Sequence, residues 1–393
     1  MLPSFLCPNC RAADMAVFYE ATDVPVHSVL LMPTREAALA YPTGNIALGF
    51  CPACGFIANT AFDPGVHEYS SSYEETQGFS ATFNTFHRQL AMRLIERYAL
   101  RNKAVIEIGC GKGEFLALLC ELGNNRGIGF DPAYVSGRYH STVQDRLTFI
   151  QDFYSEKYAG CQADFVCCKM TLEHIQGTAD FVRSLHWSLG KHAETVVFFQ
   201  VPDVTRILQE LAFWDIYYEH CSYFSPGSLA RLFRSCGFAI IDLVREYDAQ
   251  YLMLEARPSY GQAAPAVSPE DDLETLARQV QHFAAHSRQK LAAWQDLLRR
   301  MHHQGRRVVI WGAGSKGVAF LTTLKVRHEI THAVDINPYK HGTYMAGTGH
   351  QIVGPDFLRD YLPDVVIIMN PIYREEIRQA LAVRGLTPEL LTV

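Results

Sequence analysis

The chain has few charged residues and no block of basic ones. Asp, Glu, Lys and Arg make up 19% of its 393 residues, and the formal net charge is −6. Nucleic-acid-binding proteins normally carry a positive face, so this composition disfavours a nucleic acid as partner. No stretch is long and apolar enough to span a bilayer, and residues 1–7 lack the basic region and apolar core of a signal peptide. We therefore expect a cytoplasmic protein without a membrane partner.

The cysteines also argue against a disulfide-stabilised scaffold. There are eleven, an odd number in a chain of this size, which fits a reducing cytoplasm and a metal site better than paired disulfides. A length of 393 residues exceeds a single hydrophobic core and predicts two or three domains. The sequence carries no signal for an oligomeric state.

Four of the cysteines stand in two C-x-x-C pairs near the N-terminus. Cys7 and Cys10 form the first pair, and Cys51 and Cys54 form the second. Two intervening residues let both thiolates of a tight turn face one ion, and four thiolates in a tetrahedron suit structural Zn²⁺. A thioredoxin-like redox role is the alternative, but two matched pairs favour zinc. Such a closed site has no open position for catalysis, so we assign it to folding and positioning.

An apolar, β-branched run at 105–108 leads into three alternating glycines and then a helical pattern. Glycine tolerates positive φ and has no Cβ, so this turn lets a ligand approach the backbone. The spacing E-x-G-x-G-x-G resembles the first motif of class I S-adenosylmethionine-dependent methyltransferases. Asp131 ends the next strand, where the resemblance implies bonds to ribose hydroxyls, and Asp152 follows the strand at 147–150, where it would hold the adenine amino group. The expected cofactor-binding residues are Glu107, Gly109, Gly111, Gly113, Asp131 and Asp152.

After Asp131 the pattern alternates strands and helices, which predicts a parallel sheet covered on both faces. Ligands in such doubly wound sheets lie beyond the carboxyl ends of the strands. The polar and aromatic segment 69–80 precedes the glycine turn, so we expect it to cover the methyl donor. Tyr69 and Tyr73 are its candidate functional residues, Tyr69 toward the substrate and Tyr73 in catalysis; an ordinary loop is the alternative.

Proton-transfer groups stand consecutively in the segment 214–226, which follows the strand at 195–202. The intrinsic pKa of His220 suits a general base near neutrality. Glu219 could orient that imidazole, and Tyr218 could donate a hydrogen bond to a developing oxyanion. Glu173 and His174, in the L-E-H-I run that follows another strand, are not assigned a catalytic role.

The paired cysteines, E-I-G-C-G-K-G and Y-E-H-C-S-Y-F-S together resemble the sugar C-methyltransferases of deoxysugar biosynthesis. The resemblance covers nearly the whole chain. It implies an N-terminal zinc domain, a central Rossmann-like methyltransferase domain and a C-terminal Rossmann-like α/β domain. It also implies that His220 removes a proton next to a ketone, with Glu219 and Tyr218 as its neighbours.

The C-terminal region begins after a linker of small and helix-breaking residues and an amphipathic helix expected from Ser268 to about 303. Residues 312–317 then form a G-x-G-x-x-G loop after a strand, with an acid at Asp335 after the next strand, which by motif alone predicts a dinucleotide site. A lysine inside the loop departs from that pattern, and the family comparison suggests the diphosphate of a nucleotide-linked sugar instead. A loop that only packs is also open. The candidate substrate residues here are Gly314, Ser315, Lys316 and Asn370.

The domains expected are therefore 1–68, binding zinc; 69–257, binding S-adenosylmethionine; 258–304, linker and helix; and 305–393, binding the nucleotide sugar. The activity expected is C-methylation of a small-molecule substrate, a keto-deoxysugar linked to a nucleotide such as thymidine diphosphate. The alternatives are methyl transfer to oxygen or nitrogen of another small molecule, a zinc-knuckle binding protein, and an NAD-dependent dehydrogenase.

Overall fold

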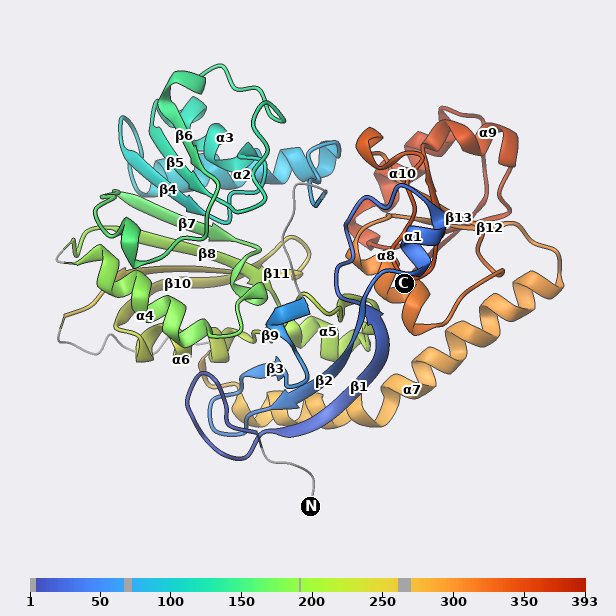
Figure 1. Cartoon of the computed structure of the whole chain (residues 1–393), viewed down its shortest axis with the longest axis horizontal. Coiled ribbons are helices and arrows are strands. Elements are labelled where there is room, and N and C mark those ends of the chain that lie inside the picture. The colour runs from blue at the N-terminus through green and yellow to red at the C-terminus, as the bar shows by residue number, and fades with distance from the viewer. Residues whose placement is uncertain (1–4, 67–72, 191, 261–269) are drawn as a thin grey trace.

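The computed structural model describes residues 5–66, 73–190, 192–260 and 270–393, which form three sheets with helices around them (Figure 1). The architecture is α/β, as the alternation of strands and helices predicts. Within these residues no helix is both long and apolar enough to cross a membrane.

The N-terminal sheet is antiparallel and takes one strand from far along the chain. Its order is β1 (Ala16–Pro25), β2 (Thr43–Phe50), β3 (Ile57–Asn59) and β9 (Ser222–Tyr223). The short helix α1 (Arg35–Leu39) lies between β1 and β2 in the chain. Strand β9 follows the segment that contains His220, so this sheet extends into the predicted catalytic segment.

The central sheet has seven strands. Their order is β10 (Phe238–Glu246), β11 (Tyr251–Pro258), β8 (Val196–Pro202), β7 (Phe165–Lys169), β4 (Ala104–Ile108), β5 (Arg126–Phe130) and β6 (Leu147–Ile150). Strands β6, β5, β4, β7 and β8 run parallel, whereas β11 is antiparallel to both of its neighbours. The chain leaves β4 toward β5 and β6 and later returns to β7 on the other side. The edge between β4 and β7 is therefore the switch point where such sheets bind ligands.

Helices cover both faces of this sheet, because its central strands carry apolar residues on both faces. Alternate residues, such as Val105 and Phe165, pack with α2 (Ala81–Arg97) and α3 (Glu114–Gly123). Their neighbours, such as Ile106 and Val166, pack with α4 (Thr178–Leu189) and α6 (Pro226–Ser235). The two-residue period of a strand thus divides one apolar run between two cores.

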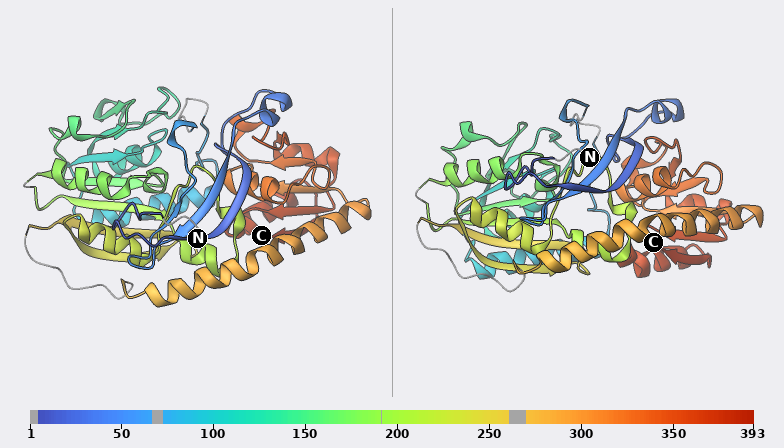
Figure 2. Two further views of the ribbon diagram at one scale, coloured as in Figure 1. Left: turned by 60° about the horizontal axis from the view of Figure 1, so that its bottom comes forward. Right: turned by 90° about the horizontal axis from the view of Figure 1, so that it is seen from below.

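Helix α7 (Leu273–His303) runs from the central domain to the C-terminal domain (Figure 2). Its apolar stripe includes Phe283 and Trp294, which join a core shared with β1, α5 (Val204–Glu210) and the C-terminal sheet. The expected start at Ser268 lies outside the described residues, and the helix begins at Leu273. The Asp272 carboxylate accepts hydrogen bonds from the Ser225 hydroxyl (2.6 Å) and the Gly227 amide (2.9 Å), which ties the start of α7 to α6.

The C-terminal sheet is wholly parallel. Its order is β14 (Gln351–Val353), β13 (His332–Val334), β12 (Val308–Trp311), β15 (Val365–Ile368) and β16 (Glu389–Thr392). Helices α8 (Ser315–Thr323), α9 (Leu358–Tyr361) and α10 (Arg374–Ala382) accompany it. The G-x-G-x-x-G loop joins β12 to α8 beside the switch point between β12 and β15, as the motif predicts.

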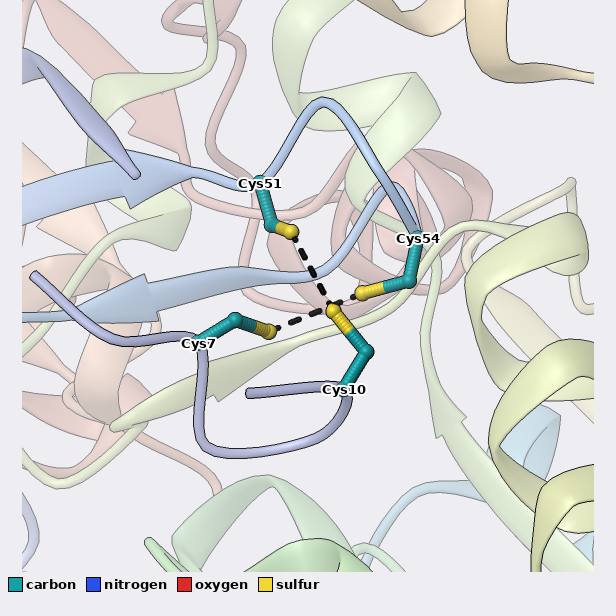
Figure 3. Close-up of side chains that lie close together, drawn as sticks. All are labelled: Cys7, Cys10, Cys51 and Cys54. Atoms are coloured by element: carbon teal, nitrogen blue, oxygen red, sulfur yellow. Dashed lines mark hydrogen bonds between the residues drawn. The ribbon is translucent and has the colours of Figure 1, made fainter. Parts of the chain in front are cut away.

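The four N-terminal cysteines lie together at one end of the N-terminal sheet (Figure 3). Their sulfur atoms are within 4.8 Å of one another, with 3.6 Å between Cys7 and Cys54 and between Cys10 and Cys51. A tetrahedral ion with metal–sulfur bonds of about 2.3 Å has sulfur–sulfur edges of about 3.8 Å. The donor set and its spacing therefore fit a closed four-thiolate metal site.

Candidate active site

One cavity of about 750 Å³ lies between the central and C-terminal domains. It extends along the carboxyl ends of β4, β5 and β7 and reaches the glycine loop after β12. Its lining includes residues from the predicted cofactor turn, from the segment 73–83, from the segment around His220 and from the C-terminal domain. Regions of the chain that the sequence singled out separately thus line the same cavity.

The turn after β4 requires glycine. Gly109 has φ +70°, and a Cβ built on it would lie 2.0 Å from the Thr171 hydroxyl oxygen. Gly113 has φ +85° and is the N-cap of α3, where a Cβ would lie 2.5 Å from the Phe149 ring. Both positions combine a left-handed backbone with the absence of room for a side chain. Gly109 and Gly111 line the cavity, so the turn exposes backbone to a ligand.

The two acids predicted to hold the nucleoside both line the cavity, but only one is rigidly held. Asp131 accepts hydrogen bonds from the backbone amides of Gly111 (2.9 Å) and Ala133 (2.8 Å), which fix its carboxylate beside the turn. Asp152 is near the surface, where its carboxylate accepts a hydrogen bond from Tyr158 (2.6 Å) and pairs with Lys157. Lys157 lowers the pKa of Asp152, so this carboxyl group is ionised.

Glu107 at the end of β4 is 2% exposed, and it lines the cavity. Its Oε2 has no hydrogen-bond partner among the described residues, and burial raises the pKa of its carboxyl group to about 7. An unpartnered buried carboxylate oxygen costs free energy unless a ligand supplies a donor. Together with the glycine turn and Asp131, this orphaned oxygen fits the cationic, ribose-bearing cofactor that the motif predicts.

His220 lies deep in the same cavity among aromatic and acidic groups. It is 4% exposed, and its ring centroid is 4.1 Å from that of Tyr217 and 4.8 Å from that of His174. Its Nε2 is 4.0 Å from Oε1 of Glu173, and ligand atoms of Glu173, His174 and His220 lie within 4.8 Å of one another. All four side chains line the cavity.

Burial sets the charge state of this cluster. It lowers the pKa of His220 well below the ordinary value, and the neighbouring His174 and Lys316 add to that effect. It lowers the pKa of His174 to about 3 and raises that of Glu173 to about 8. At neutral pH His220 is therefore an unprotonated base, whereas most of Glu173 is protonated and able to donate a hydrogen bond.

Tyr218 does not face the cavity, which corrects the expectation that it donates to a developing oxyanion. Its hydroxyl oxygen accepts a hydrogen bond from the Asp63 amide (2.8 Å), and its ring packs against Phe62 in the N-terminal part of the chain. The neighbouring Tyr217 lines the cavity instead. The two tyrosines stand at a turn, in which the His220 amide donates a hydrogen bond to the Tyr217 carbonyl oxygen (3.2 Å), and the sequence Tyr-Tyr does not reveal which one faces the site.

Glu219 also lies behind the cavity wall, and it contacts the N-terminal domain. Its carboxylate accepts hydrogen bonds from the amide (3.3 Å) and the hydroxyl of Ser28. The Ser28 hydroxyl is in turn 2.7 Å from the hydroxyl of Ser315, which lines the cavity. One serine therefore links the catalytic segment to the C-terminal glycine loop. No sequence signal marks Ser28, because its role depends on the packing of three domains.

The segment before α2 closes one side of the cavity. Tyr73 lines the cavity, and its carbonyl oxygen accepts a hydrogen bond from Lys112 of the glycine turn (2.9 Å). The ring of His27 lies 5.7 Å from the Tyr73 ring. Tyr69, the other tyrosine expected here, lies outside the described residues.

The C-terminal glycine loop lines the cavity through Gly314, Ser315 and Lys316. Lys316 pairs with Asp215 of the central domain, and Asn370 exchanges hydrogen bonds with Gln250 (2.9 and 3.1 Å). Each of these polar groups already has a protein partner across the domain interface.

Asp335 is the acid that would bind a ribose in a dinucleotide site, but its carboxylate already contacts groups of the protein. Its carboxylate accepts hydrogen bonds from the amides of Ala313 (3.0 Å) and Asn337 (2.9 Å) and lies 3.3 Å from Lys340. This buried lysine leaves the carboxylate with less capacity for ribose hydroxyls, which disfavours NAD.

Glu173, His174 and Tyr217 are the site residues that sequence reasoning did not assign. The sequence placed the first two after a strand of the parallel sheet, where active-site residues gather, and that position was the available signal. The sequence does not show how close these residues lie to His220, because the fold of the segment 214–226 sets that distance.

Comparison with known proteins agrees with this geometry. Residues 83–243 match a family described as a methyltransferase domain, and residues 261–385 match the C-methyltransferase C-terminal domain. The chain is 26% identical over 306 residues to the C-methyltransferase NovU of Streptomyces niveus, covering 74% of this chain and 72% of that protein.

Solved structures with likeness to the chain include two methyltransferases. One is the 1,6-didemethyltoxoflavin-N1-methyltransferase of Burkholderia thailandensis, with a TM-score of 0.34, 16% identity and coverage of 47% of this chain and 83% of that one. The other is the magnesium protoporphyrin IX methyltransferase of Synechocystis PCC 6803. Its TM-score is 0.36 and its sequence identity 15%, with coverage of 45% of this chain and 84% of that one. Both were solved with S-adenosylhomocysteine bound.

The glycine turn, the acids beside it and the two matched domains lead to one assignment. The chain is an S-adenosylmethionine-dependent methyltransferase that carries the C-terminal domain of the C-methyltransferases.

Proposed function

We propose that this enzyme methylates carbon in a keto-deoxysugar linked to a nucleotide, with thymidine diphosphate as the expected carrier. The observation that carries the proposal is the single cavity that joins the glycine turn, His220 and the C-terminal glycine loop. Such a space can hold a methyl donor at one end and a long, anionic acceptor at the other. The match to the C-terminal domain of C-methyltransferases supports carbon as the methylated atom.

The ketone makes carbon methylation chemically accessible, because a carbonyl acidifies the neighbouring C–H group. Bound S-adenosylmethionine supplies an electrophilic methyl group. His220, unprotonated in its buried position, takes the proton from the carbon next to the ketone. The electron pair left on that carbon, shared with the ketone oxygen as an enolate, would then form the new bond to the methyl carbon, while the methyl–sulfur bond breaks and S-adenosylhomocysteine leaves.

Two neighbours of His220 can stabilise the enolate oxygen. Burial raises the pKa of Tyr217 well above its ordinary value, so its phenol stays a hydrogen-bond donor. The protonated carboxyl group of Glu173 is a second donor at the same place. Tyr73 faces them from the segment that covers the cofactor turn, where we propose that it positions the sugar. Glu219 acts behind them through Ser28, as a positioning residue.

The C-terminal domain would hold the nucleotide. We propose that Gly314, Ser315 and Lys316 receive the diphosphate and that Asn370 faces the rest of the nucleotide, with Tyr69 as a further candidate. A lysine beside glycine-loop amides is a common way to bind phosphate. On this proposal the segments 1–68, 69–257 and 305–393 bind zinc, donor and acceptor respectively.

The four N-terminal cysteines would hold a structural Zn²⁺, as their spacing allows. The site is closed, so the ion would add stability and take no part in methyl transfer.

Proton exchange tests the proposed reaction directly. The enzyme is incubated in D₂O with S-adenosylhomocysteine in place of the donor. A thymidine-diphosphate-linked keto-deoxysugar should then exchange one hydrogen next to its ketone for deuterium, and mass spectrometry measures this exchange. His220→Ala should slow this exchange, and turnover with the donor, by roughly 10²–10⁴-fold, because a positioned base contributes about that much. Its affinity for S-adenosylhomocysteine should stay nearly unchanged.

Transfer to oxygen or nitrogen needs no enolate and gives no exchange. Methylation of the sugar without exchange, or unchanged exchange in His220→Ala, would contradict the proposed mechanism. His286→Ala, on the exposed face of α7, is the matched control and should behave as the wild type.

The two adjacent tyrosines provide a second test. Tyr217→Phe should lower turnover by about 10²–10³-fold, as expected for the loss of one oxyanion donor. Tyr218→Phe should leave turnover within a few-fold of the wild type and cost about 1 kcal/mol of stability, since it removes the hydrogen bonds of the hydroxyl with the Asp63 amide (2.8 Å) and carbonyl oxygen (3.3 Å). Steady-state kinetics and thermal unfolding distinguish the two. A larger kinetic effect at Tyr218 would reverse the assignment.

The protonation of Glu173 should be visible in stability. Because its pKa is raised to about 8 in the folded protein, it favours folding fully below about pH 4.5, and this contribution is lost as the pH rises through about 8. Relative to Glu173→Gln, the wild type should lose about 1.4 kcal/mol of unfolding free energy per pH unit between about pH 5.5 and 7.5. Urea unfolding at several pH values measures this, with Glu36→Gln on the exposed face of α1 as control. An equal pH dependence in wild type and Glu173→Gln would show that Glu173 is already ionised.

Metal analysis tests the cysteine site. The purified protein should contain close to one equivalent of zinc, and Cys51→Ser should lower both the zinc content and the melting temperature. Cys161→Ser lies outside the cluster and should change neither. Full zinc content in Cys51→Ser would place the ion elsewhere.

A further inference from the structure

A buried lysine stands at the end of β7, in the part of the cavity next to the glycine turn. Lys169 is 9% exposed and lines the cavity. Its Nζ is 2.8 Å from Nε2 of His87 and 3.8 Å from the centre of the Phe115 ring. Within the described ranges no carboxylate oxygen lies within 4.0 Å of this nitrogen. A buried ammonium without a close counter-ion is costly, so an anion is expected beside it.

The nearest acid is on the adjacent strand. Glu107 on β4 pairs in register with Cys167 on β7, two residues before Lys169. Glu107 and Lys169 attract each other, yet they form no close ion pair, and Oε2 of Glu107 remains without a partner. The cavity therefore presents a negative and a positive group side by side, each with unused hydrogen-bonding capacity. This is the complement of a zwitterion.

The strand order indicates which end of the methyl donor lies here. Asp152 follows β6 and Asp131 follows β5, and these two acids are the proposed partners of adenine and ribose. The glycine turn follows β4, and the next strand in the sheet is β7. A cofactor laid across these ends in the order adenine, ribose and sulfur must place its amino-acid part at β7.

Lys112, the lysine within the glycine turn, is already engaged. Lys112 donates hydrogen bonds to the carbonyl oxygens of Tyr73 (2.9 Å) and Ala133 (3.4 Å) and lies 3.5 Å from Glu75. The contacts with Tyr73 and Glu75 hold the covering segment against the turn, so of these two lysines Lys169 is the one available to a ligand.

We infer that Lys169 binds the α-carboxylate of the methionine moiety of S-adenosylmethionine, while Glu107 accepts hydrogen bonds from its α-ammonium group. His87 is a positioning residue in this arrangement. Its Nε2 accepts one N–H of Lys169 and directs the other two toward the cavity. The inference deepens the proposed function and rests on its placement of the methyl donor at the glycine turn.

The charge state of His87 supports this arrangement. Burial lowers the pKa of His87 well below its ordinary value, and the nearby Lys169 lowers it further. The imidazole therefore stays neutral and can accept a hydrogen bond from an ammonium group. The same burial, opposed by Glu107, lowers the pKa of Lys169 to about 8, so the lysine is largely charged at neutral pH.

Binding measurements with three ligands test the inference without any turnover. S-adenosylhomocysteine carries the whole amino-acid part, its decarboxylated analogue lacks only the carboxylate, and 5′-methylthioadenosine lacks both charged groups. By calorimetry, Lys169→Met should bind S-adenosylhomocysteine about 10–100-fold more weakly than the wild type, as expected for a charged hydrogen bond. It should bind the other two ligands within about three-fold of the wild type.

The wild-type protein alone gives an independent test, which does not depend on how the variant folds. It should bind S-adenosylhomocysteine more tightly than the decarboxylated analogue. The ratio of the two affinities should equal the factor by which Lys169→Met weakens binding of S-adenosylhomocysteine. Lys169→Arg should recover part of that preference, and Lys325→Met, at an exposed position, should behave as the wild type.

The outcomes separate this inference from the proposed function. If the wild type does not distinguish S-adenosylhomocysteine from the decarboxylated analogue, Lys169 has no carboxylate to bind and the inference is wrong. An equal loss for all three ligands in Lys169→Met would likewise overturn it, since the lysine would then support the whole pocket. If the wild type binds none of the three, the cofactor site itself is misplaced and both proposals fail.

Discussion

Burial determines the charge of the titratable groups around His220, on which the proposed chemistry depends. Burial raises the pKa of Glu173 to about 8 and keeps His220 and His174 unprotonated. In water the carboxyl group would be ionised and the two imidazoles partly protonated. In the folded protein they become a neutral base among hydrogen-bond donors, which is what proton removal from carbon requires. The cavity depends on more than one domain, because residues of both the central and the C-terminal parts of the chain line it.

Sequence patterns predicted the parts of the fold that depend on local physical rules. The β-branched run before Gly109 identified β4, the spacing of three glycines identified the turn, and the G-x-G-x-x-G loop was found after β12. Each rests on backbone conformation or on strand periodicity, which neighbouring residues encode. The clustering of the four cysteines also followed from their spacing, because two tight turns present four sulfur atoms in only a few ways.

The orientation of individual side chains in the site was not predictable in the same way. Tyr218 was expected to donate to an oxyanion in the site, but Tyr217 lines the cavity instead and Tyr218 is turned toward Asp63. Ser28 is some 190 residues from Glu219 in sequence, and nothing in its surroundings marks it as a partner. Both depend on contacts between domains, which a local pattern does not contain. The same reason explains why Asp335, an acid in the correct place for a dinucleotide, is used by Lys340.

The pairing of β9 with β3 has a consequence for how the chain can be divided. The two residues of β9 follow directly after Cys221, and they complete the sheet whose other three strands come from the first sixty residues. If the central domain were produced alone, it would carry this segment without its partners, and the N-terminal part alone would expose the edge of β3. Unpaired strand edges invite association with other chains. Exchange of N-terminal domains between relatives would therefore succeed only when the exchanged piece brings a β3 that fits the recipient's own β9.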